Sequence, residues 1–254
     1  KAGMGEAYCH VVLTDTVNDV IIRGDFGYSD ERKNVSMITG TALFIKIYET
    51  DSLYLHADTL YAFRDSLGNN SVLAFNHVKF LKSDLQGRCD SLTFIESDSL
   101  ITMYENPVLW SEANQLTGTL ITLKTYNGKL ERLNIYNTAF IISEADSTQQ
   151  YNQVKGKNMT GYFCNDSLYK VVVEGNGESV YFAKKEDGTP IGMNKVECSD
   201  MLIFVEGNDI SSITFITKPD GVTVPQEDIN PKDKLLKGFR WESADRPQSI
   251  PDLF

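Results

Sequence analysis

The stretch CDSLTFIESDSLITMYENPVLW, residues 89–110, decides the fold because two alternating runs flank a polar step. Leu92 and Phe94 alternate with polar residues in the first run, as do Ile101 and Met103 in the second. Alternation with a period of two is typical of a strand with one apolar face, and the step ESDS is rich in turn-forming residues. The stretch therefore predicts strand, turn, strand, and its Asn-Pro pair predicts a bend, because proline donates no ladder hydrogen bond.

Similar phrases recur along the chain, each with a small residue followed by Asp or a substitute for it. The marker positions are Asp25, Asp58, Asp90, Leu120, Asn158 and Asp200, separated by 33, 32, 30, 38 and 42 residues. Six units of about 30 to 40 residues therefore fill the chain from about Val20 to Pro225. Such a unit is too small to bury its apolar face alone, so the units are expected to stack.

The second runs of five units align on one another. Residues two apart point to one face of a strand, so these pairs predict an apolar column along one wall. The pairs are Val72 and Ala74, Ile101 and Met103, Leu133 and Ile135, Val171 and Val173, and Ile213 and Phe215. Asn, Gly or Pro follow at residues 75–78, 104–107, 136–139 and 174–177, which predicts a corner in each unit.

Helix signals are almost absent from these units, so the fold class is all-β. A right-handed parallel β-helix and a long jelly roll of antiparallel hairpins both fit the period, and the short polar steps favour hairpins. We expect residues 1–225 to form a single elongated, twisted jelly roll. Residues 226–254, which are rich in proline, are expected to form a cap or strap, or a partner-binding segment, with a helical turn or two after Pro231.

The composition limits the classes of function. The 254 residues carry a formal net charge of −11, which argues against binding to nucleic acid or to an anionic membrane surface. No run approaches the roughly 18 to 20 apolar residues that a membrane-spanning helix needs. The chain begins without Met or an apolar targeting run, so we expect that any signal segment has been removed. The four cysteines are expected to be small buried residues, with one disulfide left open.

Reactive constellations are lacking, so we expect no enzyme, no cofactor and no metal site. His77 is expected to be a polar corner residue, and His56 a solvated strand residue. One Asp in each unit is too sparse for a calcium repeat or a pair of catalytic carboxylates. The marker aspartates are therefore expected to stabilise turns or strand edges.

Three stretches within residues 57–80, 89–110 and 116–142 carry a family resemblance: ADTLYAF with VLAFNHVKF, CDSLTFIESDSLITMYENPVLW, and LTGTLITLKTYNGKLERLNIYNTAFII. This repeated phrasing resembles the OstA-like family of periplasmic lipopolysaccharide-transport proteins. That family includes the bridge protein and the N-terminal domain of the outer-membrane lipopolysaccharide assembly protein. The resemblance covers residues 20 to 225 and is weakest in the fourth and fifth units and in the tail.

The resemblance implies a V-shaped, twisted jelly roll whose apolar groove holds the acyl chains of lipid A. It also implies a periplasmic location, an outer-membrane association left open, and open sheet edges that join copies or other transport proteins head to tail. The groove candidates are Val72, Ala74, Leu92, Phe94, Ile101, Met103, Leu133, Ile135, Val171, Val173, Ile213 and Phe215. The same residues could form a closed sandwich core. The alternative function is a β-helical polysaccharide-active enzyme or a surface adhesin.

Overall fold

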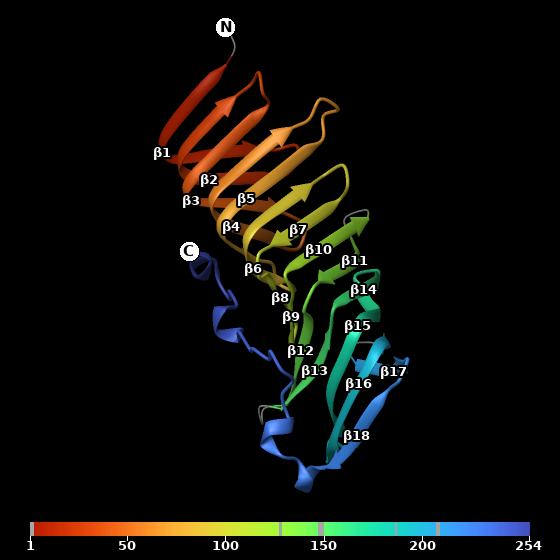
Figure 1. Ribbon diagram of the computed structural model, residues 1–254. Coiled ribbons are helices and arrows are strands. Elements are labelled where there is room, and N and C mark those ends of the chain that lie inside the picture. The colour runs from red at the N-terminus through yellow and green to blue at the C-terminus, as the bar shows by residue number, and fades with distance from the viewer. Residues whose placement is uncertain (1–2, 127–128, 147–149, 186, 207–208) are drawn as a thin grey trace. The chain divides into compact units, whose positions relative to one another are not determined.

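The computed structural model describes residues 3–126, 129–146, 150–185, 187–206 and 209–254 (Figure 1). The chain divides into two compact units. Unit 1 holds the described residues up to Glu112 together with Ala244–Phe254, and unit 2 holds Ala113–Ser243. No α-helix occurs in the described ranges, and none of their helices is long and apolar enough to span a membrane.

Unit 1 is an antiparallel sheet in which each strand from β1 to β6 pairs with the next, and β6 pairs with both β7 and β8. Its strands are β1 (Met4–Asp15), β2 (Val20–Asp30), β3 (Val35–Ile47), β4 (Ser52–Arg64), β5 (Asn70–Leu81), β6 (Gln86–Ile95), β7 (Leu100–Tyr104) and β8 (Val108–Ser111). The 3-10 helix η4 (Ile250–Leu253) also belongs to this unit.

Unit 2 contains two runs of paired strands that share β15 and β16. One run is β10, β11, β14, β15, β16 and β17, and the other is β9, β12, β13, β15, β16 and β18. The strands are β9 (Asn114–Thr117), β10 (Leu120–Tyr126), β11 (Lys129–Tyr136), β12 (Ala139–Asp146), β13 (Gln150–Gly156), β14 (Asn158–Cys164), β15 (Ser167–Lys184), β16 (Pro190–Glu206), β17 (Asp209–Ile216) and β18 (Asp220–Pro225). The 3-10 helices η1 (Gln226–Asp228), η2 (Pro231–Asp233) and η3 (Ser243–Asp245) follow.

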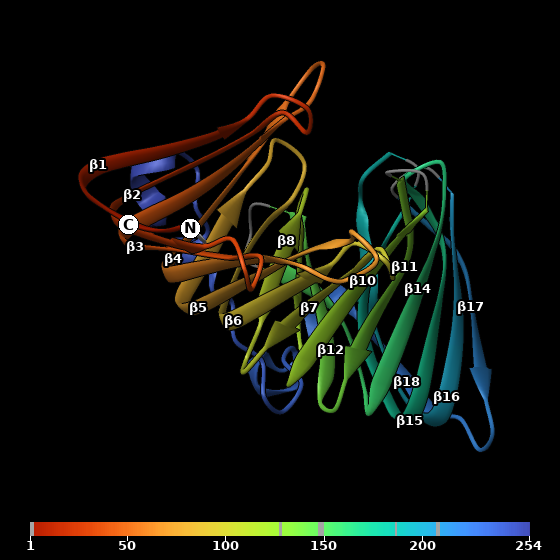
Figure 2. The same ribbon diagram turned by 90° about the horizontal axis from the view of Figure 1, so that it is seen from above.

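Every strand pairing described is antiparallel, which confirms the all-β jelly roll and contradicts a parallel β-helix. The predicted corners are also present. Pairs of consecutive residues with positive φ interrupt the strands at 9–10, 40–41, 76–77, 105–106, 137–138, 175–176 and 217–218. Asn, Gly and other small polar residues supply most of these positions because they tolerate left-handed backbone at low cost. Each corner divides the strands of its unit into two layers, which we call layer 1 and layer 2 (Figure 2).

Layer 1 holds the predicted apolar pairs, and layer 2 holds the halves of the strands beyond the corner. In unit 1, layer 1 comprises Met4–Tyr8, Phe26–Asp30, Val35–Thr39, Thr59–Arg64, Asn70–Phe75, Ser91–Ile95 and β7. Layer 2 comprises Val11–Asp15, Val20–Gly24, Ala42–Ile47, Ser52–Ala57, Val78–Leu81, Gln86–Cys89 and β8. In unit 2, the first run of paired strands forms layer 1 and the second run forms layer 2, with β15 and β16 crossing both.

The small residues of the repeat lie at the remaining corners, which lack consecutive residues with positive φ and where the two layers approach each other. A Cβ atom at Gly24 would collide with Ile38, and one at Gly118 would collide with Ile135. Ala57 occupies an equivalent corner and is completely buried. Only a residue with little or no side chain fits here, because an apolar side chain from layer 1 fills the space.

The marker aspartates tie neighbouring corners together, as predicted for structural turn residues. The Thr41 hydroxyl donates to Asp25 Oδ2 at 3.2 Å, and Gly175 N donates to Asp200 Oδ1 at 2.9 Å. His77 Nδ1 lies 2.9 Å from Asp58 Oδ2, which confirms His77 as a polar corner residue. These contacts stabilise the left-handed turns, where the backbone N–H and C=O groups no longer form the regular hydrogen bonds between strands.

Two predictions about single residues are wrong, the first because the C-terminal residues cover the sheet at His56. His56 is buried, its Nδ1 lies 2.8 Å from Ala42 O, and its ring packs against that of Phe254 at 4.6 Å. It is therefore not solvated. Cys89 is buried as expected, but Cys9 and Cys164 are exposed, and all four thiols are free.

Candidate functional site: the apolar groove

Layer 1 of unit 1 presents two apolar rows on the face that looks toward layer 2. We call the row nearest the corner row 1; it runs in register through Ile38, Leu60, Ala74, Leu92 and Met103. Row 2 lies two residues farther out and runs through Ser36, Ala62, Val72, Phe94 and Ile101. The strand register thus brings all six predicted groove residues of unit 1 to one face.

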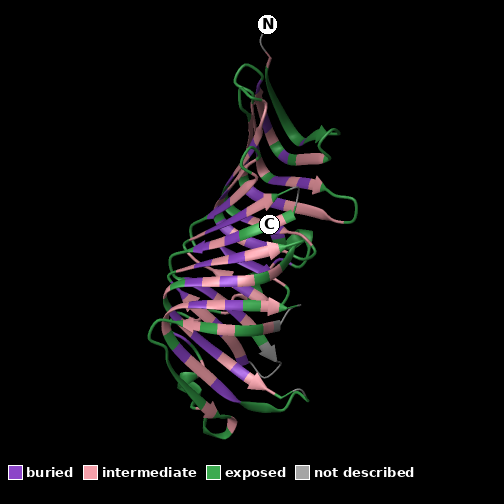
Figure 3. Ribbon diagram, turned by 90° about the vertical axis from the view of Figure 1, so that its right-hand side faces the viewer, coloured by how far each residue is buried: buried purple, intermediate pink, exposed green. Residues whose placement is uncertain are grey.

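The two rows differ in exposure. Row 1 is buried throughout, with Met103 and Ala74 completely inaccessible, whereas every member of row 2 is half-buried (Figure 3). Row 1 therefore has the burial of a core, and row 2 keeps apolar surface available to another molecule.

Unit 2 repeats this arrangement with the other six predicted residues. Its row 1 runs through Ile121, Ile135, Met159, Val173, Met201 and Phe215, and its row 2 through Leu123, Leu133, Gly161, Val171, Ile203 and Ile213. Most of both rows is buried, and the members on the edge strand β17 are half-buried.

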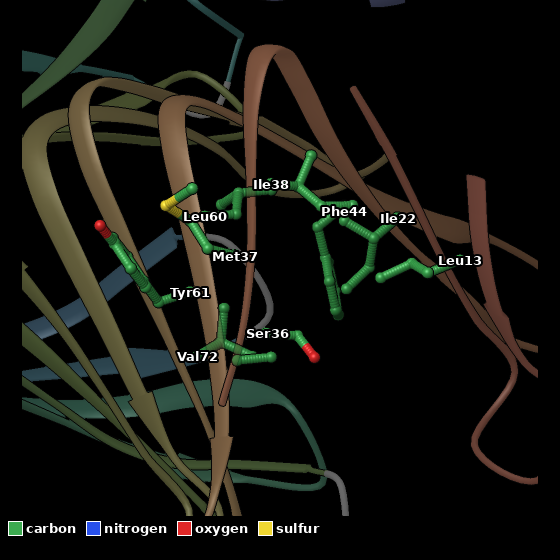
Figure 4. A pocket seen from close by; sticks show the side chains of 10 residues that line it. Leu13, Ile22, Ser36, Met37, Ile38, Phe44, Leu60, Tyr61 and Val72 are labelled. Atoms are coloured by element: carbon green, nitrogen blue, oxygen red, sulfur yellow. The ribbon is translucent and has the colours of Figure 1, made fainter. Parts of the chain in front are cut away.

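Layer 2 supplies the facing wall of the groove in unit 1. Leu13, Ile22 and Phe44 lie in register on neighbouring strands and line a hollow (Figure 4). The other side of the hollow includes two members of row 1, Ile38 and Leu60, and three members of row 2, Ser36, Ala62 and Val72. The hollow is open to solvent, and most of its lining residues are apolar. Its lining therefore has few polar groups to orient a small polar ligand. We call the space between row 2 and the facing wall of layer 2 the apolar groove, and it suits a flexible apolar chain. Of the predicted groove residues, Val72 lines the hollow itself, whereas Phe94 and Ile101 continue row 2 beyond it.

Tyr61 is the one ionisable residue among those that line the hollow. Burial lowers the pKa of the His56 imidazole, which lies on the outer face of layer 2, and raises the pKa of the Cys89 thiol at a corner to about 12. Within the described ranges, no three His, Cys, Asp or Glu side chains gather as a metal site would require. The groove can bind apolar groups, because the residues that line the hollow are apolar apart from Ser36 and the hydroxyl of Tyr61.

The layer 2 wall was not predicted from the sequence, and neither were the members of row 1 and row 2 on β3 and β4. Leu60 and Ala62 follow Asp58 as Leu92 and Phe94 follow Asp90, so the repeat itself contained the signal. For Leu13, Ile22 and Phe44 there was no such signal, because their runs are apolar on both faces.

The outer face of layer 1 in unit 1 is not uniformly polar. Tyr8 and Phe26 are ring neighbours at 5.1 Å, and Tyr61 and Phe75 meet edge to face at 5.9 Å. Tyr104 continues the same face on β7. Tyr8, Phe75 and Tyr104 are exposed, so an aromatic surface lies outside the apolar groove.

Comparisons with known proteins show a similarity to solved structures. No protein-family model matches the sequence, and no curated protein matches it. Among solved structures, the chain is similar to LptH of Pseudomonas aeruginosa, described as the LptA-homologous periplasmic component of the lipopolysaccharide transport device. The two are 14% identical, the match covers 56% of this chain and 95% of LptH, and the TM-score is 0.41. At this level nothing about binding or partners transfers, and the groove is interpreted on its own geometry.

Proposed function

We propose that the protein is a non-enzymatic lipid carrier that holds the acyl chains of lipopolysaccharide in the apolar groove. The observation that supports this proposal best is row 2, a half-buried apolar row that faces a second apolar wall across an open hollow. The family resemblance of the repeats, which lie in the same strands, independently points to lipopolysaccharide.

The physical chemistry of the groove suits this ligand. Each methylene removed from water contributes about 0.8 kcal/mol, so a few acyl chains along the rows give strong binding without an ion pair. A net charge of −11 would repel a phosphorylated headgroup. Binding through the tails leaves that headgroup in water, so an acidic protein can carry an anionic lipid.

The edges of the two units support assembly end to end with further copies or with other transport proteins. In the part of the chain that is described, β1 pairs only with β2, and β17 and β18 pair only with β16. Almost all of β1 is exposed. Unpaired strands are templates for strand addition, and a periplasmic carrier could use them to form a continuous path.

Photo-crosslinking tests the proposal most simply. A photoreactive amino acid at Phe94 in row 2 should capture lipopolysaccharide, whereas the same amino acid at Thr93, next along the strand and on the outer face, should not. Equal capture at both positions, or none at Phe94, would contradict binding in the groove.

A surface adhesin for glycans has one observation in its favour, the outer aromatic face of layer 1 in unit 1. Exposed Tyr and Phe rings offer flat apolar contact with polar edges, which suits sugar rings. Immobilised polysaccharides would distinguish this function: Tyr61→Ala and Phe75→Ala should reduce retention if the face binds glycans, and should not affect it if the groove alone binds.

A further inference from the structure

The segment Ile229–Ser243 covers the outer face of layer 2 in unit 2. The side chain of Gln153 on β13 points to this face, where its Oε1 accepts from Leu236 N at 2.8 Å. Leu236 is itself buried against apolar residues of the sheet. Side chains alternate between the two faces of a strand. Asn152 and Val154, on either side of Gln153, therefore belong to the inner face, which looks toward layer 1.

Two glycines confirm which face looks toward layer 1. A Cβ atom at Gly156 would collide with Val173, and one at Gly177 would meet Met201. Both Val173 and Met201 belong to row 1 of unit 2. Gly156 lies two residues beyond Val154 on β13 and so shares its face. The inner face of layer 2 thus approaches row 1 at the corner, and its residues farther from the corner face layer 1 as well.

A hydroxyl or amide side chain occurs at the same level of this inner face on every strand of the layer. The strand register brings these side chains into one continuous line, which we call the polar row. It comprises Asn114, Ser143, Asn152, Tyr181, Asn194 and Thr223. None of them is charged, and all are half-buried except Thr223, which is exposed. Another molecule can therefore reach the polar row, and it meets neutral groups there.

Three side chains of the polar row have hydrogen-bonding capacity that the described part of the chain does not use. Asn152 Oδ1 accepts from Phe182 N at 2.9 Å, and its Nδ2 donates to no described residue. The Tyr181 hydroxyl forms no hydrogen bond within the described ranges. Asn194 Nδ2 donates to the Thr223 hydroxyl at 3.1 Å, and its Oδ1 remains as an acceptor. Donors on β13 and β15 thus lie beside an acceptor on β16.

Ser179 is a second observation that points to a ligand. It lies on the inner face, two residues closer to the corner than Tyr181 on β15. Its residue is 2% exposed, and its Oγ has no hydrogen-bond partner among the described residues. Native interiors rarely keep a buried hydroxyl without a partner, because the lost hydrogen bonds to water lower stability. A polar group that enters beside Tyr181 would supply the missing partner.

The occupant must combine apolar chains with a neutral group that both accepts and donates hydrogen bonds. Layer 1 of unit 2 offers apolar side chains such as Leu133 and Val171 of row 2. A secondary amide fits the polar row, because its C=O accepts from Asn152 or Tyr181 and its N–H donates to Asn194 Oδ1. An ether has neither a C=O nor an N–H group. A carboxylate or phosphate would lose water without gaining a cation, since the polar row has no charged residue.

We propose that the polar row binds the amide that joins an acyl chain to an amino sugar, so that unit 2 selects N-acylated sugar lipids. This inference rests on the proposed carrier function and adds selectivity to it. Methylenes against apolar rows supply affinity for any acylated ligand. The amide distinguishes one acylated ligand from another, because a ligand without it leaves the groups of the polar row unpaired.

Two synthetic lipids of equal chain length test the inference. Both carry the same glucosamine disaccharide, with the chains attached by amides in one and by ethers in the other. The full-length chain is titrated with each, and the Kd of the ether lipid is divided by that of the amide lipid. A ratio of about ten or more is expected, because the ether lipid loses two hydrogen bonds. Equal affinity would overturn the inference and leave the carrier function standing, whereas binding of neither lipid would overturn both.

Variants of the polar row assign the selectivity to its side chains. Tyr181→Phe removes one hydroxyl, and Asn152→Asp removes the Nδ2 donor while keeping an acceptor for Phe182 N. Each should reduce the ratio about fivefold. Tyr151→Phe is the matched control, because Tyr151 lies next to Asn152 on β13 but on the outer face, where its ring packs 5.1 Å from that of Phe239.

The control should leave the ratio within about twofold of its value in the unmodified chain. An unchanged ratio in Tyr181→Phe and Asn152→Asp, or an equal fall in Tyr151→Phe, would overturn the inference.

Infrared spectroscopy measures the hydrogen bond itself. The amide carbonyls of the lipid are labelled with carbon-13, and their band is compared in the unmodified chain and in Ser179→Ala and Tyr181→Phe. A carbonyl bonded by the polar row absorbs at low frequency, so the band should move to higher frequency in the variants. A band at the same frequency in all three chains would show that the polar row does not bond the amide, which overturns the inference.

Discussion

The substitution Phe94→Asp separates a groove from a core. Phe94 lies in the half-buried row 2, so its removal loses only part of its apolar burial, about 1 to 2 kcal/mol. A domain with a free energy of unfolding of roughly 5 to 15 kcal/mol remains folded after that loss. Leu92→Asp, on the same strand in the buried row 1, places a carboxylate in a closed site and should unfold unit 1.

Lipid binding, unlike folding, should be strongly weakened by Phe94→Asp. A carboxylate in row 2 prevents an acyl chain from contacting one strand of the wall. The spacing between strands is about 4.8 Å, which is the length of roughly four methylenes of the acyl chain. At about 0.8 kcal/mol for each methylene the loss is about 3 kcal/mol, or roughly a hundredfold in Kd. Thr93→Asp adds the same charge one residue away on the outer face and should leave Kd unchanged.

The assay combines thermal unfolding by circular dichroism with titration of fluorescent lipopolysaccharide. The expected pattern is a folded Phe94→Asp chain that binds weakly and a folded Thr93→Asp chain that binds normally. Unfolding of Phe94→Asp would show that row 2 is core, and unchanged binding by a folded Phe94→Asp chain would show that lipid does not lie along row 2. Either result refutes the assignment of the groove.

Three further predictions concern the corners and the buried titratable groups. Gly24→Val should lower the melting temperature strongly, because its side chain has no space against row 1, and differential scanning calorimetry measures this. Burial lowers the pKa of His56, so its stabilising effect should be complete above about pH 6.5 and fall as the pH decreases toward the folded-state pKa; His56→Gln should flatten that part of a urea-unfolding profile. Cys9 and Cys164 should react with a thiol reagent at pH 8, whereas Cys89, whose pKa is raised to about 12, should react only after denaturation.

The repeat in the sequence predicted much of layer 1. Period-two alternation placed Val72 and Ala74 opposite Phe94 and Leu92, because a strand with one buried face has little freedom of register. The corners were predictable for a similar reason, since left-handed backbone restricts the choice of residue.

The marker residues predicted the strand faces less well in the later units, because a shift of one residue turns a side chain to the opposite face of the sheet. Leu60 follows its marker Asp58 by two residues, whereas Met201, which takes the equivalent inward position, follows Asp200 by one. The spacing of residues in the sequence cannot show this difference of one residue, because the extra residue lies in the corner and not in the alternating run.

The role of the tail could not be predicted because its contacts are not periodic. Gln115 and Gln153 look like ordinary polar strand residues until the backbone of the segment lies over them. In the same way, His56 in an alternating run suggested exposure, and only the packing of Phe254 shows why it is buried.

Native mass spectrometry of the full-length chain tests the central claim most directly. The chain is mixed either with lipopolysaccharide or with the same molecule stripped of its acyl chains. The groove predicts a bound species for the acylated molecule and none for the deacylated one, because affinity comes from methylenes against row 2. Equal binding of both molecules, or binding of neither, would contradict the carrier function.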